Sequence, residues 1–238
     1  MKIKLICCVG LDYDTELIPH FCKHYSKYNI YSFHFILNKL KDFEIKDYLE
    51  HFSNLPITLP FIGAKLNFEK WVGEFNAIDK IDKFNHIIKH SNESHILLSD
   101  IDEFQQHTKS IKSNYVWGNL LDRESSDSPF KKVTSENIEV QFPITSNKSN
   151  WKNTIKPCVF PKSELLKTSH FITTPYKNEP LIDVHHYRWT NTRLQKSKDR
   201  YRIYTKLNKD GKRWPNGYKL ATNESNNIVH QTKEKGLI

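Results

Sequence analysis

A short apolar run that ends in acidic residues is the feature that most constrains this chain. Ile96, Leu97 and Leu98 together are long enough for a buried strand and too short for a helix. Asp100 and Asp102 follow this run, one residue apart. Ligands of open α/β sheets bind at the carboxyl ends of strands. The pair therefore predicts a site for Mg²⁺ or Mn²⁺, which prefer oxygen ligands and commonly take one or two carboxylates together with substrate phosphate oxygens.

Acidic pairs of this kind also arise by chance and in solvated loops, so the position of the pair matters. It follows the apolar run directly, in the middle of the chain, and a helical pattern precedes it. Phosphatases of the haloacid dehalogenase type also use Asp-x-Asp, but normally after the first strand and followed by Thr or Val. Here Glu103 and Phe104 follow. The position favours a cation site at the end of a central strand.

Strand patterns and helix patterns alternate along the chain. Apolar, β-branched and aromatic runs predict strands, and apolar residues at three- to four-residue intervals predict amphipathic helices. The predicted strands are residues 2–9, 31–37, 56–59, 96–98, 115–121, 138–142, 155–160 and 181–187, and the predicted helices are residues 15–25, 42–52, 68–90 and 191–207. The alternation predicts an α/β fold with a mostly parallel sheet flanked by helices.

Length and composition indicate one globular domain. The chain has 238 residues, enough for a substantial core, and 13% aromatic residues, too many for a disordered chain. We assign residues 1–205 to this domain and residues 206–238 to a polar tail that packs on it or extends from it. The four cysteines include an adjacent pair and have no metal-ligand spacing. They are predicted to be reduced, in a cytoplasmic protein of a bacterial or host cytosol. No stretch is long enough and apolar enough to span a membrane.

The formal net charge of +9 predicts an anionic partner. A nucleoside diphosphate, a membrane surface contacted peripherally and nucleic acid all fit, and lysines spread over an ordinary surface would give the same charge. The chain has neither G-x-G-x-x-G nor a Walker loop, which disfavours dinucleotide and P-loop enzymes.

Three segments, in this order, resemble a known family. They are Glu16, Leu17, His20, Phe21, His24 and Tyr25 in a helix, Asp100-Ile101-Asp102-Glu103-Phe104 after a strand, and His186-Tyr187-Arg188 before a lysine-rich helix. Together they resemble GT-A fold glycosyltransferases, closest to family 92 and the related family 2-like group, over about residues 2–205. The turn at residues 38–42 departs from the family pattern, because only Asn38 and Asp42 match it.

The resemblance implies a single-domain, Rossmann-like GT-A fold and a metal-dependent enzyme. Such an enzyme moves a hexose from a nucleotide-diphosphate sugar, by family habit a UDP-sugar, to a glycan or another hydroxyl acceptor. Mn²⁺ or Mg²⁺ would be held by Asp100 and Asp102, one of which would also touch the ribose, with His186 as a third ligand. His185 is the alternative third ligand, because strand alternation points the two histidines in opposite directions. No nucleic-acid partner is expected of such an enzyme, and its oligomeric state is not predicted.

Further contacts to the donor are predicted at the ends of other strands. Asp12 and Asn38 follow or end the first two strands and are candidates for the base and ribose of the nucleotide. Lys65 is a candidate for a phosphate or base contact, and Arg188 for the diphosphate. The nearby cations Arg193, Lys196 and Arg200 either join Arg188 or form a solvated helix face.

A general base is needed if the transfer inverts the anomeric centre, because the acceptor hydroxyl must lose its proton. Asp122, at the end of a strand, is the first candidate, and Glu124, Glu139 and Asp183 compete with it. Trp117 and Gly118 on that strand form either an acceptor platform or part of the core.

Two other classes of function remain open. The acidic pair and the positive charge would also suit a metal-dependent nuclease or another phosphodiester enzyme. The basic last third of the chain would suit a non-catalytic polyanion binder, which would leave the acidic pair unexplained. Cleavage of DNA or RNA in Mg²⁺ would identify the former class.

Overall fold

The computed structural model describes residues 1–53, 65–107, 111–127, 130–146, 155–168, 171–177 and 179–209. The strands are β1 (Ile3–Gly10), β2 (Ser32–Lys39), β3 (Lys65–Val72), β4 (His95–Leu98), β5 (Glu103–Gln105), β6 (Val116–Glu124), β7 (Ile144–Ser146), β8 (Ile155–Pro161), β9 (Leu166–Thr168), β10 (Phe171–Ile172) and β11 (Leu181–His186). The α-helices are α1 (Ile18–Tyr25), α2 (Ala77–Lys89), α3 (Ile138–Gln141) and α4 (Arg193–Lys209), and the 3-10 helices are η1 (Thr15–Leu17) and η2 (Ile45–Phe52).

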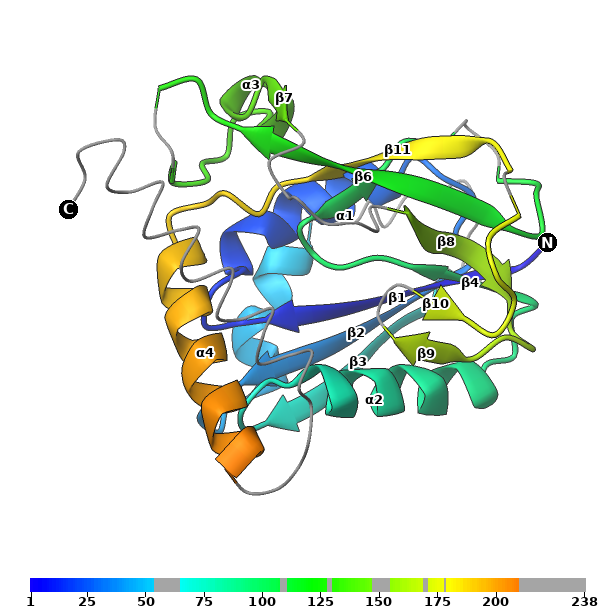
Figure 1. Cartoon of the computed structure of the whole chain (residues 1–238), viewed down its shortest axis with the longest axis horizontal. Coiled ribbons are helices and arrows are strands. Elements are labelled where there is room, and N and C mark those ends of the chain that lie inside the picture. The colour runs from blue at the N-terminus through cyan, green and yellow to red at the C-terminus, as the bar shows by residue number, and fades with distance from the viewer. Residues whose placement is uncertain are drawn as a thin grey trace.

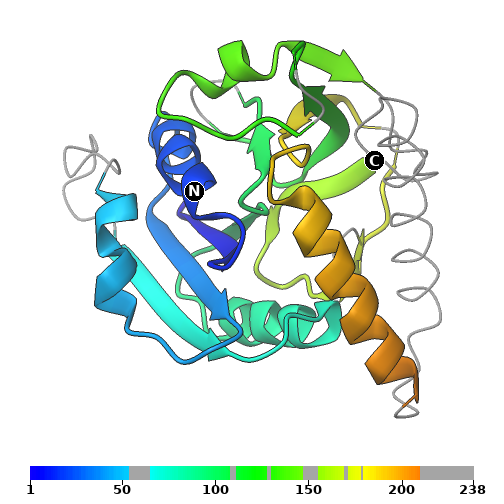
Figure 2. The ribbon, with the colours of Figure 1, turned by 90° about the vertical axis from the view of Figure 1, so that its left-hand side faces the viewer.

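A nine-stranded mixed sheet forms the centre of the molecule, with helices on both faces (Figures 1 and 2). The strand order is β3-β2-β1-β4-β8-β6-β11-β5, with β7 paired to β6. β1 is parallel to β2 and β4, β2 is parallel to β3, and β6 is parallel to β11. β8 is antiparallel to both β4 and β6, so β4 and β6 run in the same direction. The prediction of an α/β fold with a mostly parallel sheet is confirmed.

The sheet order brings several strand ends to one edge. The chain passes from β1 outward to β3 and then returns across β1 to β4, so the order reverses between β1 and β4. Such a reversal is where open α/β sheets bind ligands. The carboxyl ends of β1, β2, β4, β6 and β11 all lie at this edge, which we call the carboxyl edge.

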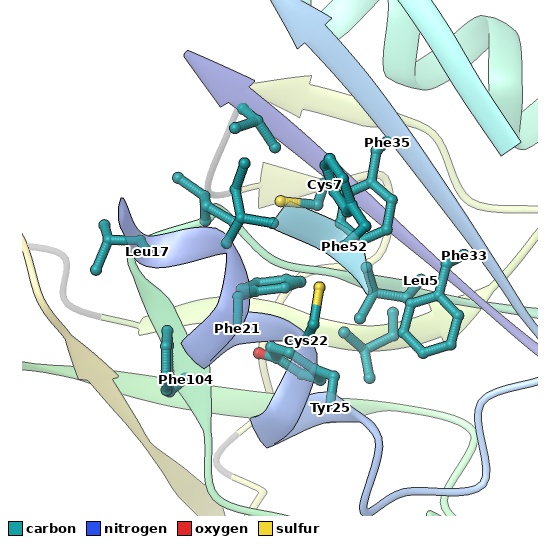
Figure 3. Close-up of a cluster of buried hydrophobic side chains, with 14 of the residues drawn as sticks. Leu5, Cys7, Leu17, Phe21, Cys22, Tyr25, Phe33, Phe35, Phe52 and Phe104 are labelled. Carbon is teal, nitrogen blue, oxygen red and sulfur yellow. The ribbon is translucent and has the colours of Figure 1, made fainter. Parts of the chain in front are cut away.

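Alternating residues of β1 fill two separate hydrophobic clusters. Leu5 and Cys7 face α1 and pack with Phe21 in the cluster drawn in Figure 3. Ile6 and Cys8 belong to the other cluster, which includes residues of α2. Burial on both faces explains why this strand is a continuous apolar run rather than an alternating one. All four cysteines are free and buried.

The structure corrects several predicted elements. The single helix predicted over residues 68–90 is β3 followed by α2. Gly73, with φ of 120°, ends the strand in a conformation that favours glycine, and the Asn76 side chain accepts the Asp79 N–H to cap α2. The strand predicted over residues 138–142 contains α3, which Asn137 caps. The helix predicted over residues 42–52 is the 3-10 helix η2, and the short strand β5 was not predicted.

Two predictions concern segments that the structure does not describe, or describes only in part. The strand expected over residues 56–59 lies outside the described residues. The domain boundary placed at residue 205 falls inside α4, and residues 210–238 of the predicted tail are also outside the description. No helix in the described ranges combines the length and the hydropathy needed to cross a bilayer.

One buried and one half-buried histidine should make the protein sensitive to mild acid. The Nε2 atoms of His24 and His107 lie 2.9 Å and 2.7 Å from the main-chain and side-chain oxygens of Gln105. Burial lowers the pKa of each to about 4. An unfolded histidine titrates near 6.5, so the unfolded state binds more protons between pH 6.5 and 4. Stability should therefore be complete above pH 6.5 and should fall by about 2 kcal/mol per histidine as the pH drops to 4.5.

Urea unfolding at pH 7 and pH 4.5 measures this loss, with His24→Gln as the comparison. A glutamine amide can still donate to the Gln105 carbonyl but does not titrate, so the variant should lose less stability than the wild type over this interval. Equal losses in the two proteins would exclude His24 as a source of the acid sensitivity.

Candidate functional site

The acidic turn after β4, Ser99–Glu103, is closed by its own residues. The Glu103 N–H donates to the Asp100 carbonyl over 3.0 Å, and the Asp100 N–H donates to Glu103 Oε2 over 2.9 Å. Ile101 is buried inside the turn, and Phe104 after it packs against Tyr187 of the segment that follows β11. These contacts direct the apolar side chains into the core and fix the backbone that carries Asp102.

His186 connects two strands and the acidic turn at the carboxyl edge. It ends β11 and lies directly opposite Asp122 of β6 in the parallel register. Its Nδ1 lies 3.0 Å from Asp122 Oδ1, and its Nε2 lies 3.5 Å from Asp102 Oδ2. The Tyr187 N–H donates to the Asp102 carbonyl over 2.7 Å, which ties the end of β11 to the acidic turn. Three residues far apart in the sequence therefore meet through one imidazole ring.

The two carboxylates control the charge of His186. Burial lowers the pKa of His186, but the interactions with Asp102 and Asp122 raise it by more, to about 9. Burial likewise raises the pKa of Asp102, but His186 and Lys196 hold it well below its usual value. Near pH 7 these pKa shifts favour an imidazolium beside an ionised carboxylate.

Asp100 has a different environment from Asp102. Lys80 of α2, whose side chain is only 8% exposed, forms an ion pair with Asp100. Burial opposes ionisation of Asp100, but Lys80 and Lys156 lower its pKa overall. The two carboxylates of Asp-x-Asp thus point to separate partners, one to a lysine and the other to the histidine.

Glu103 forms an ion pair that the sequence did not predict. Lys156 of β8 contacts Glu103, and the two side chains are 2% and 4% exposed. Because Glu103 also accepts the Asp100 N–H, this pair supports the acidic turn from inside the protein. Glu103 is a structural part of the turn.

Cations from the segment after β11 and from α4 surround the group. Arg188 and Arg193 are buried, and burial lowers the pKa of both, with mutual repulsion as a further cause for Arg193. Lys196 forms an ion pair of 2.9 Å with Asp14 in the loop after β1. Figure 2 looks onto the carboxyl edge and shows α4 lying across it.

The remaining predicted donor residues are not all in this group. Asp12 lies at the same edge, where Oδ2 accepts the Leu40 N–H over 2.9 Å. Asn38 is buried and donates to the carbonyls of Trp71 and Gly73, over 3.2 and 3.1 Å. Both side chains hold neighbouring loops together.

Lys65 is placed away from the group. It begins β3 opposite Ser32, the first residue of β2, and therefore lies at the amino edge of the sheet. The structure does not bring this residue to the predicted donor site, because it starts a strand whose carboxyl end is at the site.

The candidates for a general base differ in burial. The Asp122 side chain is 1% exposed and contacts His186. Glu139 and Asp183 are exposed, and Glu124 is half-buried at the end of β6. His185 points away from the group and contacts Gln106 through Nδ1 over 3.2 Å. None of these contacts tests a catalytic role.

Trp117 and Gly118 belong to the core, and the interpretation as an acceptor platform is wrong. Trp117 is 3% exposed, and its ring centroid lies 5.5 Å from that of Tyr176. A Cβ atom at Gly118 would lie 2.4 Å from a methyl group of Val184. Close packing between β6 and β11 explains the glycine.

The residues fit a divalent cation only in part. Within the described ranges, no group of three or more His, Cys, Asp or Glu side chains could hold a metal ion. Asp102 Oδ2 and His186 Nε2 nevertheless lie 3.5 Å apart, a separation that suits two ligands about 2.1 Å from one ion. Mg²⁺ in phosphate-transfer sites commonly takes one or two protein ligands and completes its shell with phosphate and water. The geometry of Asp102 and His186 fits that arrangement, while Asp100, the other predicted ligand, forms an ion pair with Lys80.

Comparison with known proteins finds distant structural neighbours. No family model and no curated protein matches the chain. HddC from Yersinia pseudotuberculosis aligns with 80% of this chain and 91% of its own, at 9% identity and a TM-score of 0.40. S. aureus TarS 1-349 in complex with UDP aligns with 68% of this chain and 47% of its own, at 16% identity and a TM-score of 0.33. S. aureus TarS aligns with 87% of this chain and 40% of its own, at 11% identity and a TM-score of 0.37.

The matched region is thus less than half the length of either TarS chain. Similarity at this level assigns neither a family nor an activity.

Proposed function

We propose that this protein is a metal-dependent glycosyltransferase that uses a nucleotide-diphosphate sugar. The observation that carries the proposal is the meeting of Asp102 and His186 beside buried cations at the carboxyl edge. A nucleoside diphosphate offers several negative charges to such a site, and Mn²⁺ or Mg²⁺ bound by Asp102 and His186 would add positive charge next to it. The donor sugar, with UDP-hexoses as the first candidates, and the hydroxyl acceptor belong to the same proposal.

Arg188 and Arg193 would bind the leaving group. Two buried guanidinium groups that repel each other gain from an anion placed between or beside them. The diphosphate becomes more negative as the glycosidic bond breaks, so fixed cations stabilise the transition state more than the bound donor. Lys196, near the start of α4, forms an ion pair with Asp14 and lies on the same side of the site. It would add to the positive charge near the diphosphate.

The acceptor hydroxyl would need a general base in an inverting transfer. Glu124, half-buried at the end of β6, and the exposed Asp183 and Glu139 are more accessible to an acceptor than Asp122. Asp122 is the first candidate that the sequence predicts for this general base.

The two alternative classes have less support from the geometry. Two-metal phosphodiester chemistry needs several carboxylates around a pair of ions. In the acidic turn, Asp100 and Glu103 are engaged by Lys80 and Lys156. A polyanion binder would use the same cations but would have no need for the pairing of Asp102 with His186.

A thermal-shift screen of nucleotides and nucleotide sugars, with Mn²⁺ and with a chelator, tests the proposal. A ligand at about 100 times its Kd should raise the Tm by about 5 °C or more, because it binds only the folded state. The shift should require Mn²⁺ and should be followed by release of free nucleotide when a donor is incubated with the protein. No shift with any nucleotide, together with stabilisation by DNA or heparin, would favour the polyanion binder.

A further inference from the structure

We propose that Asp122 is a positioning residue for His186, and that it holds this ring with Nε2 directed at the cation shared with Asp102. This inference rests on the proposed function and assigns to Asp122 a role other than that of general base. The structure supplies the three elements needed: a buried carboxylate, a ring between two strands and a second carboxylate on the opposite side of that ring.

The contacts of the ring fix its orientation. Asp122 Oδ1 and His186 Nδ1 are 3.0 Å apart, across directly paired residues of β6 and β11. The side chain of Asp122 is 1% exposed, so water hardly competes for this contact. On the other side of the ring, Nε2 lies 3.5 Å from Asp102 Oδ2. The ring thus has one nitrogen toward the protein interior and the other toward the acidic turn.

A carboxylate at Nδ1 selects the tautomer that can bind a cation. A neutral imidazole carries one N–H, and the nitrogen without hydrogen is the ligand. Ionised Asp122 can only accept a hydrogen bond, so it retains the hydrogen on Nδ1 and leaves the lone pair on Nε2. Metal-bound histidines commonly donate their other N–H to a carboxylate, and loss of that partner typically weakens metal binding by about 10- to 100-fold.

The burial of Asp122 also argues against a role as the general base. A general base must come within hydrogen-bond reach of the acceptor hydroxyl. Asp122 has 1% of its side chain exposed, and one oxygen is directed to His186. Asp183, by contrast, is exposed.

Titration of the full chain with Mn²⁺, followed by the EPR signal of free Mn²⁺, tests the proposal. Asp122→Asn keeps the size of the side chain but allows its amide to donate to Nδ1, which would select the wrong tautomer. We expect the affinity for Mn²⁺ to fall by about 10- to 100-fold. Asp183→Asn, which removes the same charge from the neighbouring strand, should bind Mn²⁺ as the wild type does. Unchanged Mn²⁺ affinity in Asp122→Asn with greatly reduced transfer would overturn the positioning role and make Asp122 the base.

A second measurement needs no variant and therefore does not depend on folding of Asp122→Asn. Long-range ¹H–¹⁵N spectra of the Mg²⁺-loaded wild-type protein should show His186 with hydrogen on Nδ1 and none on Nε2. The opposite tautomer would overturn the proposal.

The same experiments distinguish this inference from the proposed function. Wild-type protein that transfers sugar without binding Mn²⁺ would overturn the role of Asp122 and leave a transferase. A protein that shows the expected Mn²⁺ affinities but acts on no nucleotide sugar would overturn the transferase and leave the role of Asp122.

Discussion

Asp102→Asn is expected to reduce turnover of a nucleotide-sugar donor by about 10²- to 10³-fold, the usual cost of removing one electrostatic group from an active site. The variant loses the carboxylate that faces His186 Nε2 but retains the side-chain shape. The Asp102 backbone still accepts the Tyr187 N–H, and His186 keeps its contact with Asp122. The protein should therefore remain folded while its catalytic constant falls. Release of free nucleotide from the donor measures the activity, and thermal unfolding measures the stability.

Asp100→Asn is the matched control, because it makes the same chemical change two residues earlier in the same turn. It leaves the mostly buried Lys80 ammonium without its ion-pair partner. We expect a loss of stability of about 1–3 kcal/mol, less than for a fully buried pair because Asp100 is partly exposed. The two variants should thus separate, with Asp102→Asn losing more activity and Asp100→Asn losing more stability. Full activity in Asp102→Asn would exclude the proposed transferase site.

Local features of the sequence were enough to locate the acidic turn. The apolar run of β4 and the carboxylates directly after it are neighbours in the chain, and the alternation of elements was enough to place that strand in a parallel sheet. The segment containing His186 was also found, because it follows an apolar strand pattern in the same way. The family resemblance, the metal and the donor contacts remain predictions.

The partners of these residues could not be found from the sequence. Lys80 is 20 positions from Asp100, and Lys156 is 53 positions from Glu103. Lys156 reaches Glu103 because β8 lies between β4 and β6, an order that no local pattern records. The contact of Asp122 with His186 likewise depends on the register of β6 and β11.

The prediction of one helix over residues 68–90 was wrong although local signals of a break were present in the sequence. Gly73 and Asn76 mark the end of β3 and the start of α2. The apolar residues on either side continue the helical spacing, so the periodicity joined two elements into one. The burial of Trp117 could not be predicted either, because the sequence does not show whether an aromatic residue near a site is exposed or buried.

Lys156→Met is expected to cause the largest loss of stability, about 3–5 kcal/mol, because it leaves the buried Glu103 carboxylate without its cation. The loss should extend to the acidic turn, since Glu103 Oε2 also accepts the Asp100 N–H. A methionine side chain fills nearly the same space as the aliphatic part of lysine, so a cavity contributes little. Urea unfolding at pH 7 measures the free energy of unfolding.

Lys162→Met is the control, because this lysine follows the same strand β8 but is exposed and forms no ion pair with a carboxylate of the described residues. Its ammonium donates to the Ser91 carbonyl over 3.1 Å, so its removal should change stability by no more than about 1 kcal/mol. In the double variant Lys156→Met with Glu103→Gln, the buried charge is removed along with its partner, and the glutamine oxygen can still accept the Asp100 N–H. We therefore expect the double variant to recover much of the lost stability, since replacing both ions of a buried pair costs less than removing one. If Lys156→Met lost as little as Lys162→Met, the ion pair would not be what supports the turn that carries Asp102.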